Sequence, residues 1–403
     1  MLSFMFKTYG RLFATPGGLK FSVAGLVARM PISMDSLAVI FIVVHASHSY
    51  TLAGALAAVA SVVVSMSLPF WSRTSDRIGQ RRTLLIAIPL RTLFLAIFII
   101  LVTLKTPTWT WFVAIIAAES AAINAGGLVR RRWLWALGND RPLINTAYSY
   151  EALMDEIVFI LGPVIATACA TSIAPAAGLI VGLVFMLVGT TAFALQTKTE
   201  PPAHPQNLEE PHPPVFRNVV VQAVVLPCIF LGGFFSAVGI TVVAYAQNHH
   251  AASRTGIILA IWAAGSAVAA TVNGLIKWKL NHAQRFLRFL IALTLLSVPL
   301  LFTSNLIFLS AALFVSGLAV APLIIAAYGV AETSVPPSQI TETLAWVVAG
   351  MPLGGAFSSA IAGWVIDNYG AQRAFFVPLG CLCASLAMSL PYLGTWNRLR
   401  SAL

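Results

Sequence analysis

The 403-residue chain is 59% hydrophobic and only 9% charged, with a mean hydropathy of +0.87. Soluble globular domains carry about 25% charged residues, so this composition excludes a soluble globular protein and indicates an integral membrane protein. The formal net charge is +11, but the basic residues are scattered between apolar segments rather than gathered in a stripe, which argues against nucleic acid as a partner.

The apolar stretches predict about twelve membrane-spanning helices, because a helix needs roughly 20 apolar residues to cross a bilayer. The expected spans are 20–44, 52–71, 84–104, 108–128, 149–171, 174–196, 218–245, 252–276, 286–303, 305–330, 340–365 and 371–394. Before them, residues 1–19 combine large apolar side chains with Lys7 and Arg11, which is typical of an amphipathic helix at a membrane surface.

A proline-rich segment separates the sixth and seventh spans. It contains six prolines within 197–217, and proline at that density cannot remain helical. The expected fold is therefore an all-α multi-pass membrane protein of two pseudo-symmetric six-helix bundles. The predicted parts are an N-terminus at 1–19, a bundle at 20–196, a linker at 197–217, a bundle at 218–394 and a tail at 395–403.

Lysine and arginine predict the orientation. If the N-terminus is cytoplasmic, 19 of the 24 basic residues fall in cytoplasmic segments, and the outer loops hold only Lys105, Arg254 and Arg373. This asymmetry follows the positive-inside rule. We therefore expect both termini in the cytoplasm, with the chain in the plasma membrane.

The stretch Trp71–Thr83, between the second and third spans, is the most charged part of the first half. It contains Asp76, Gly79 and four arginines: Arg73, Arg77, Arg81 and Arg82. The glycine allows a sharp reversal of the chain, so the stretch predicts a short basic loop between two membrane helices.

A weaker copy of this loop follows the eighth span, at Gly274–Asn281. Trp278 stands where the first copy has its aspartate, Lys279 where it has the next arginine, and Asn281 where it has the glycine. The correspondence indicates an internal duplication into two six-helix repeats, which is a known plan of membrane transporters.

Twelve spans as six plus six, with [GS]-x-x-x-D-R-x-G-x-R-[RK] after the second, resemble the major facilitator superfamily and are similar to its actinobacterial members. The match is carried by Ser72, Asp76, Arg77, Gly79, Arg81 and Arg82. Serine replaces the family's usual glycine and is small enough for close helix packing. Gly162-Pro163 in the fifth span partially matches the glycine-proline motif of the family's exporters, although its other glycines are absent.

The resemblance implies that the basic loop is a gate. Asp76 would lie against the N-terminal end of the eleventh span, and Arg77 would pair with an acid there, for which Glu342 is the candidate. The alternative is that the arginines only satisfy the positive-inside rule. The later run Arg130–Arg132 is interpreted as an anchor for anionic lipid rather than as a substrate site.

Ionisable residues inside spans are costly and are candidates for function. The resemblance places the first and fourth helices of each half at the central cavity, and so places Asp35 and Glu119 on the substrate path. A carboxyl there can load and release a proton near neutral pH. The alternative is a structural pairing. Arg91, in the third span, is interpreted as a snorkelling or paired residue.

The fifth span carries three acids near its start, of which Glu151 and Asp155 share a helix face and Glu156 points elsewhere. Arg29, in the first span, lies at comparable depth, and the resemblance places the two helices side by side. We therefore expect an Arg29–Asp155 or an Arg29–Glu156 ion pair, with a structural role as open as a functional one.

The sequence has no phosphate-binding loop and no H-E-x-x-H or G-x-S-x-G motif, so we expect no enzyme, no cofactor and no metal site. The predicted function is proton-coupled export of drug-like or amphipathic small molecules by a monomer in the lipid bilayer. The alternative is proton-coupled transport of a small polar metabolite such as a sugar, and a third interpretation is a membrane sensor that does not transport.

Overall fold

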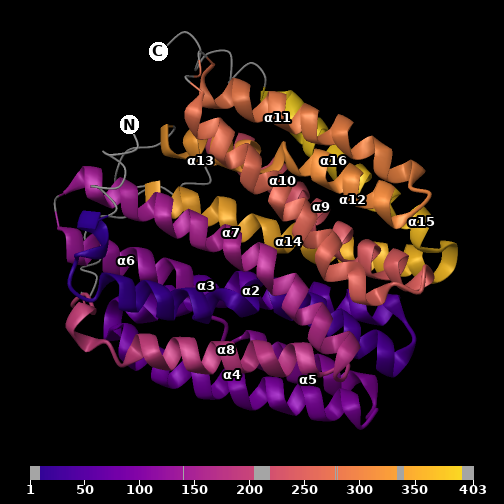
Figure 1. Cartoon of the computed structure of the whole chain (residues 1–403), viewed down its shortest axis with the longest axis horizontal. Helices are drawn as coiled ribbons and strands as arrows, with labels where there is room; N and C mark the ends of the chain where they lie inside the picture. The colour runs from indigo at the N-terminus through magenta and orange to yellow at the C-terminus, as the bar shows by residue number, and fades with distance from the viewer. Residues whose placement is uncertain are drawn as a thin grey trace. The chain divides into compact units, whose positions relative to one another are not determined.

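The computed structural model describes residues 10–138, 140–203, 218–276, 278, 280–333 and 340–392. Within these ranges the regular structure is α-helix with short 3-10 turns, and no strand occurs. Eleven helical segments of the described chain are long and apolar enough to cross a membrane. Figure 1 shows the long helices that dominate each half of the chain. The prediction of an all-α multi-pass membrane protein is confirmed.

Contacts divide the chain into two compact units. The first contains the chain up to Ala38 and from Met66 to Leu208, and the second contains Val39–Ser65 and the chain from Glu209 onward. The division therefore passes through two helices, α2 (Gly18–Ser47) and α3 (Tyr50–Ile78). The predicted bundles at 20–196 and 218–394 group the spans by their order along the chain, whereas the two units group residues by contact. The predicted limits stay a prediction.

Six helical elements complete the first unit. They are α4 (Gln80–Thr103), α5 (Thr108–Glu119), α6 (Ala125–Leu137), α7 (Arg141–Ser172), α8 (Ala177–Ala194) and the 3-10 turn η1 (Thr197–Thr199). Gly79, between α3 and α4, has φ of 93°. Because that backbone conformation strains any residue with a Cβ, this position explains the glycine of the basic loop.

The fourth span is broken, and the prediction of one continuous span at 108–128 is wrong. The apolar helix α5 has 12 residues, or about 18 Å of helix, and it ends at Glu119. After a short non-helical segment, Asn124 caps α6 by accepting a hydrogen bond from the Gly127 N–H at 2.9 Å. Capping asparagine and the weak helix-forming glycines that follow it favour a new helix start over continuation.

The second unit contains the six later spans. Its helices are α9 (Val219–Asn248), α10 (Thr255–Leu275), α11 (His282–Ser297), α12 (Leu306–Gly317), α13 (Val320–Thr333), α14 (Ile340–Tyr369), α15 (Ala371–Ala374) and α16 (Phe376–Ser389), with the 3-10 turns η3 (Ala252–Arg254), η4 (Val298–Phe302) and η6 (Leu390–Tyr392). The fourth span of this half is also interrupted, between α12 and α13. A break at the same place in both halves supports the predicted duplication.

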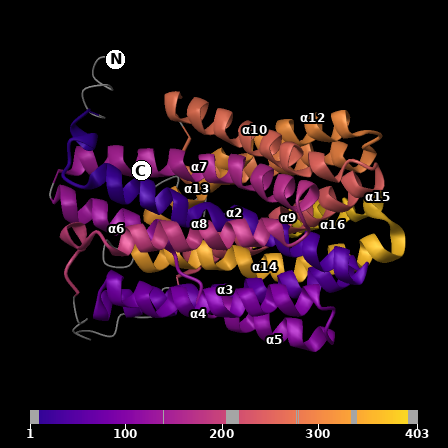
Figure 2. The ribbon, with the colours of Figure 1, turned by 60° about the horizontal axis from the view of Figure 1, so that its bottom comes forward.

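Each unit has its own close packing. In the first, Trp133 of α6 is fully buried, and its ring centroid lies 4.6 Å from that of Phe21 of α2. In the second, α9 and α14 run side by side (Figure 2). A Cβ at Gly232 or Gly354 would overlap the backbone of the facing helix, so these glycines permit the close approach.

Candidate functional site

Two carboxyls and one arginine meet inside the first unit, and we call them the Asp35 cluster (Asp35, Arg91, Glu119). Arg91 of α4 donates from Nη2 to Asp35 Oδ2 of α2 at 2.9 Å. The same nitrogen lies 3.2 and 3.1 Å from the two carboxylate oxygens of Glu119. The break after α5 leaves Glu119 as the last residue of its helix, where it reaches this arginine.

The Asp35 cluster is buried and keeps two unsatisfied polar atoms. The side chains of Arg91, Asp35 and Glu119 are 14%, 15% and 7% exposed. Asp35 Oδ1 and Arg91 Nε are buried and have no hydrogen-bond partner among the described residues. A Cβ at Gly182 of α8 would lie 2.9 Å from Asp35 Oδ1, so the glycine leaves room beside this oxygen.

The charges of the Asp35 cluster do not balance. If both carboxyls are ionised, one guanidinium faces two negative charges and the cluster carries a net charge of −1. An uncompensated charge away from water is costly, and two carboxylates that share one site do not ionise independently. The cluster is therefore neutral when it holds one proton or one further positive charge.

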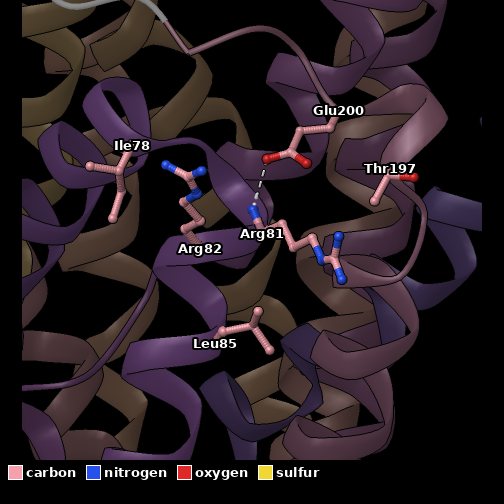
Figure 3. Close-up of a pocket in the computed structure, with 6 residues that line it drawn as sticks. All are labelled: Ile78, Arg81, Arg82, Leu85, Thr197 and Glu200. Carbon is pink, nitrogen blue, oxygen red and sulfur yellow. Dashed lines mark hydrogen bonds between the residues drawn. The ribbon is translucent and has the colours of Figure 1, made fainter.

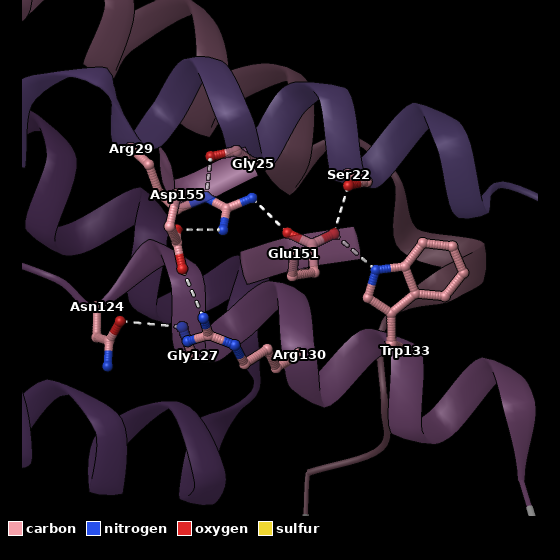
Figure 4. A network of polar contacts seen from close by, with 9 residues as sticks. All are labelled: Ser22, Gly25, Arg29, Asn124, Gly127, Arg130, Trp133, Glu151 and Asp155. Carbon is pink, nitrogen blue, oxygen red and sulfur yellow. Dashed lines mark hydrogen bonds and ion pairs between the residues drawn. The ribbon is translucent and has the colours of Figure 1, made fainter. Parts of the chain in front are cut away.

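A second ionic cluster in the same unit is larger, and we call it the Arg29 cluster (Ser22, Arg29, Arg130, Trp133, Glu151, Asp155; Figure 4). Arg29 of α2 donates from Nη1 to Asp155 Oδ1 at 2.7 Å and from Nη2 to Glu151 Oε2, both on α7. Its Nε donates to the Gly25 carbonyl at 3.1 Å.

The remaining oxygens of the Arg29 cluster are satisfied as well. Arg130 of α6 donates to Asp155 Oδ2 at 2.6 Å, and Trp133 Nε1 donates to Glu151 Oε1 at 2.8 Å. The Ser22 hydroxyl donates to the same Glu151 oxygen. Two arginines thus balance two carboxylates, and each carboxylate oxygen accepts at least one hydrogen bond, as a stable buried ion pair requires.

The structure contains the Arg29–Asp155 ion pair, which is one of the two pairings that the sequence predicted. Glu156 forms no salt bridge with the residues that the structure describes, so the other pairing is not found there. Glu151 was noted only for sharing a helix face with Asp155. It is nevertheless the more deeply buried partner, with 0% of its side chain exposed.

The run Arg130–Arg132, interpreted from the sequence as a lipid anchor, contacts protein groups in the structure, and the lipid contact stays a prediction. Because α6 is helical here, the three side chains diverge and each contacts a group of the same unit. Arg130 pairs with Asp155, Arg131 with Asp76, and Arg132 donates from Nε to Gln80 Oε1 at 2.8 Å.

The gating motif is thereby tied to α6 and to the start of the linker. Arg132 also donates from Nη1 to the Gln196 carbonyl and to Thr199 Oγ1, both at 3.0 Å. Its side chain is buried, and desolvation lowers the pKa of this guanidinium to about 10, although Glu200 opposes that shift. At neutral pH the guanidinium stays charged, and it links α6 both to Gln80, at the start of α4, and to residues 196–199.

A surface pocket of about 500 Å³ lies beside the motif (Figure 3). The carboxylate of Glu200 accepts a hydrogen bond from the backbone N–H of Arg81 at 2.8 Å, which places a negative charge at the N-terminus of α4. The guanidinium groups of Arg81 and Arg82 also line this pocket. It lies at the surface beside the basic loop, and Glu200 with the two arginines gives it a charged lining, so we do not assign it to the transported molecule.

The other predicted residues of the gate are only partly described. Ser72 and Arg77 are exposed near the end of α3. Glu342 lies in the first turn of α14, and its side chain is outside the described residues. The contact between Arg77 and Glu342 therefore stays a prediction.

The helix-bend motif, Gly162 and Pro163, lies inside α7. A Cβ at Gly162 would overlap the Ser33 side chain of α2, and the Ser33 hydroxyl donates to the Val158 carbonyl at 2.7 Å. The glycine thus permits a close approach of α7 and α2, and proline removes a backbone donor from the same turn.

The sequence interprets Arg91 as a snorkelling or paired residue, and in the structure it is paired. What the sequence did not predict is that its partners are the two candidate carboxyls, Asp35 and Glu119. A signal was present in the sequence. The first and fourth spans carry the acids Asp35 and Glu119, which need a cation nearby, and the third span contains one arginine. Metal binding has no comparable support, because the described residues contain no group of three or more potential ligands.

Eleven helical segments of the described chain are long and apolar enough to span a membrane, and ionic clusters lie buried inside the first unit, so the fold is that of a multi-pass membrane protein. A family model described as Major Facilitator Superfamily matches residues 21–306 and 225–398. The chain belongs to this superfamily, and it is a transporter rather than an enzyme.

Solved transporters share the fold. A mutant of the nucleoside transporter NupG is 13% identical with a TM-score of 0.74, and the match covers 94% of this chain and 99% of that one. A POT family transporter in complex with 5-aminolevulinic acid is 12% identical with a TM-score of 0.73, covering 95% and 97%. A bacterial homologue of the iron transporter ferroportin is 13% identical with a TM-score of 0.62, covering 93% and 98%. No curated protein matches the sequence.

Proposed function

We propose that this protein is a proton-coupled secondary transporter that works by alternating access and exports drug-like or amphipathic small molecules. The observation that carries the proposal is the Asp35 cluster, in which one arginine faces two buried carboxyls. Asp35 and Glu119 together exchange one proton, and Arg91 stays paired with whichever carboxyl is ionised. A proton taken up from one side and released to the other then accompanies each transport cycle.

The direction of transport is proposed from the helix-bend motif. Gly162 and Pro163 lie where α7 approaches Ser33 of α2, two residues before Asp35 in the chain. A change in the bend of α7 would move α2 next to the proton site. This motif resembles that of exporters in the superfamily, and it favours export over import.

The gate forms a further part of the proposal. Asp76 and Arg77, at one end of α3, would meet the start of α14 near Glu342 in the state closed to the cytoplasm. In this proposal the protein is a monomer in a bacterial plasma membrane, surrounded by lipid, with both termini in the cytoplasm. The basic residues of the cytoplasmic segments support that orientation.

Transport driven by a pH gradient tests the proposal. Purified protein is reconstituted into liposomes, a pH gradient is imposed, and the flux of cationic dyes and of sugars is measured. We expect gradient-dependent movement of an amphipathic dye, and none in empty liposomes or in a folded Asp35→Asn/Glu119→Gln variant. Sugar flux alone would favour the polar-metabolite alternative. The absence of gradient-dependent flux for every solute with folded protein would contradict the proposal and favour the sensor.

A further inference from the structure

The start of α3 is capped by an acid from a distant helix of the same unit. Asp367, near the C-terminal end of α14, accepts hydrogen bonds from the backbone N–H groups of Tyr50 at 3.0 Å and Thr51 at 2.7 Å. The Ser49 hydroxyl donates to the same carboxylate at 2.9 Å. The first N–H groups of a helix have no partner within the helix, and a negative charge is favourable at that end.

A second polar contact holds the same helix end. The Tyr50 hydroxyl donates to Gln247 Oε1 at 2.6 Å, near the C-terminal end of α9. The first turn of α3 is thus fixed to two helices of the second unit, α14 and α9. The turn between α2 and α3 and the C-terminal end of α14 meet at one end of this unit in Figure 2.

Below this cap, α3 and α14 touch through their backbones. A Cβ at Gly54 would overlap the Ser359 carbonyl, and a Cβ at Gly363 would overlap the Tyr50 carbonyl. Glycine surfaces contribute little side-chain area, so they can separate and meet again without repacking side chains. The capping carboxylate beside these glycines is therefore expected to contribute much of the free energy that holds α3 against α14.

The cap is at the opposite end of α3 from the gating motif. Asp76 lies 26 residues after Tyr50 in the same helix, which is about 39 Å of helix. Alternating access requires that contacts at one end of the transporter break while those at the other end form. A carboxylate lies at each end of α3: Asp76 of the helix itself at one end, and Asp367 of α14 at the other. Each contact would hold its own end of the transporter closed, and we call the Asp367 contact a latch.

We propose that Asp367 is a positioning residue that holds the first turn of α3 against α14 and so keeps the outer end of the transporter closed. The inference that the contact is a gate rests on the proposed alternating-access function. When the outer end opens, Tyr50 and Thr51 lose this acceptor and turn to water.

Cysteine accessibility tests the latch without a known substrate. Cys169, Cys228, Cys381 and Cys383 are first replaced, and Ser359→Cys is introduced, because Ser359 is only 3% exposed and lies against Gly54. A membrane-impermeant maleimide is then added from outside to the protein in native membranes. We expect Asp367→Asn to raise the labelling rate about three- to tenfold, the effect of a charged hydrogen-bond acceptor reduced by solvent exposure.

Three variants separate a latch from a folding defect. Asn368→Ala is the matched control, because the Asn368 side chain donates to the Trp364 carbonyl of its own helix and to no other group that the structure describes. It should leave labelling unchanged. Ser49→Ala removes one of the donors to Asp367 and should raise the labelling rate less than Asp367→Asn does. Asp367→Glu keeps the charge and should restore part of the protection.

The result decides the proposal independently of transport. Faster labelling in Asp367→Asn, with Asn368→Ala unchanged, supports the latch even if no substrate is found. Equal labelling in Asp367→Asn and the parent protein would overturn it, even if pH-driven transport is established. An equal rise in Asp367→Asn, Asp367→Glu and Asn368→Ala would also overturn it, because it would report a general loosening of this end of α14.

Discussion

The Asp35 cluster and the Arg29 cluster use the same residue types in the same unit, yet their electrostatics differ. In the Arg29 cluster two arginines face two carboxylates, and every carboxylate oxygen is hydrogen-bonded. In the Asp35 cluster one arginine faces two carboxyls, and Asp35 Oδ1 and Arg91 Nε lack partners among the described residues. The balanced cluster is neutral with both carboxylates ionised, whereas the unbalanced one is neutral only with one added proton or cation.

This difference assigns the two clusters to different tasks. The Arg29 cluster joins α2, α6 and α7 and is expected to hold them in place. The Asp35 cluster joins α2, α4 and the end of α5, and we propose that it exchanges the coupled proton. Each assignment can be tested by a substitution that removes a charge from one cluster, and the equivalent substitution in the other cluster serves as the control.

The largest effect is expected from Arg29→Met, because this change leaves Glu151, with 0% of its side chain exposed, without a cation. Breaking a buried ion pair costs about 3–5 kcal/mol, so folded protein should be largely lost. Yield and thermal unfolding in detergent measure the loss. Arg29→Glu combined with Glu151→Arg should recover part of the stability, and a double variant as unstable as the single ones would contradict the pairing.

Asp35→Asn and Glu119→Gln are expected to affect transport rather than folding. An amide cannot exchange a proton, so flux driven by a pH gradient should fall about tenfold or more in each variant. The free energy of unfolding should change by less than about 1 kcal/mol. Each single variant leaves one carboxylate facing one guanidinium, and the amide still accepts a hydrogen bond from Arg91. A large loss of stability with coupling intact would mean that this cluster, too, is structural.

Asp155→Asn is the corresponding change in the balanced cluster. It weakens charged hydrogen bonds from Arg29 and Arg130, each worth about 1.5–3 kcal/mol, so the protein should be less stable by about 2 kcal/mol. The folded fraction should keep its pH-driven flux. Loss of coupling at unchanged stability would reverse the roles given to the two clusters.

The smallest effect is expected from Gly182→Ala, which places a methyl group about 2.9 Å from Asp35 Oδ1. The carboxylate must shift, and flux should fall about two- to fivefold, with little change in stability. Gly239→Ala is the matched control, since nothing lies within 4 Å of a Cβ there. Equal flux in both variants would show that the space beside Asp35 is not used.

Hydropathy and charge were sufficient for most of the fold. The span positions follow from apolar run length. The linker at 197–217, most of which lies outside the described residues, stays a prediction. The break in the fourth span was missed because 108–128 is apolar throughout much of its length, with Glu119 as its one charged residue. The capping residue Asn124 and the two glycines after it were the local signals of that break.

The sites were harder to predict, because they depend on which helices are neighbours. Asp35, Glu119 and the Arg29–Asp155 pair could be chosen from charge inside spans. The meeting of Arg91 with both carboxyls, and that of Arg130 with Asp155, depends on the break after α5 and on the new direction of α6. Asp367 gives no sequence signal at all, since its partners lie more than 300 residues earlier in the chain.

Infrared difference spectroscopy during a pH titration tests the central claim most directly, since it detects protonated carboxyls without any substrate. The account predicts a carboxyl band that changes with pH, disappears in the folded Asp35→Asn/Glu119→Gln variant and persists in Asp155→Asn. A band that persists in the first variant and disappears in the second would contradict the account, because the exchanged proton would then belong to the balanced cluster.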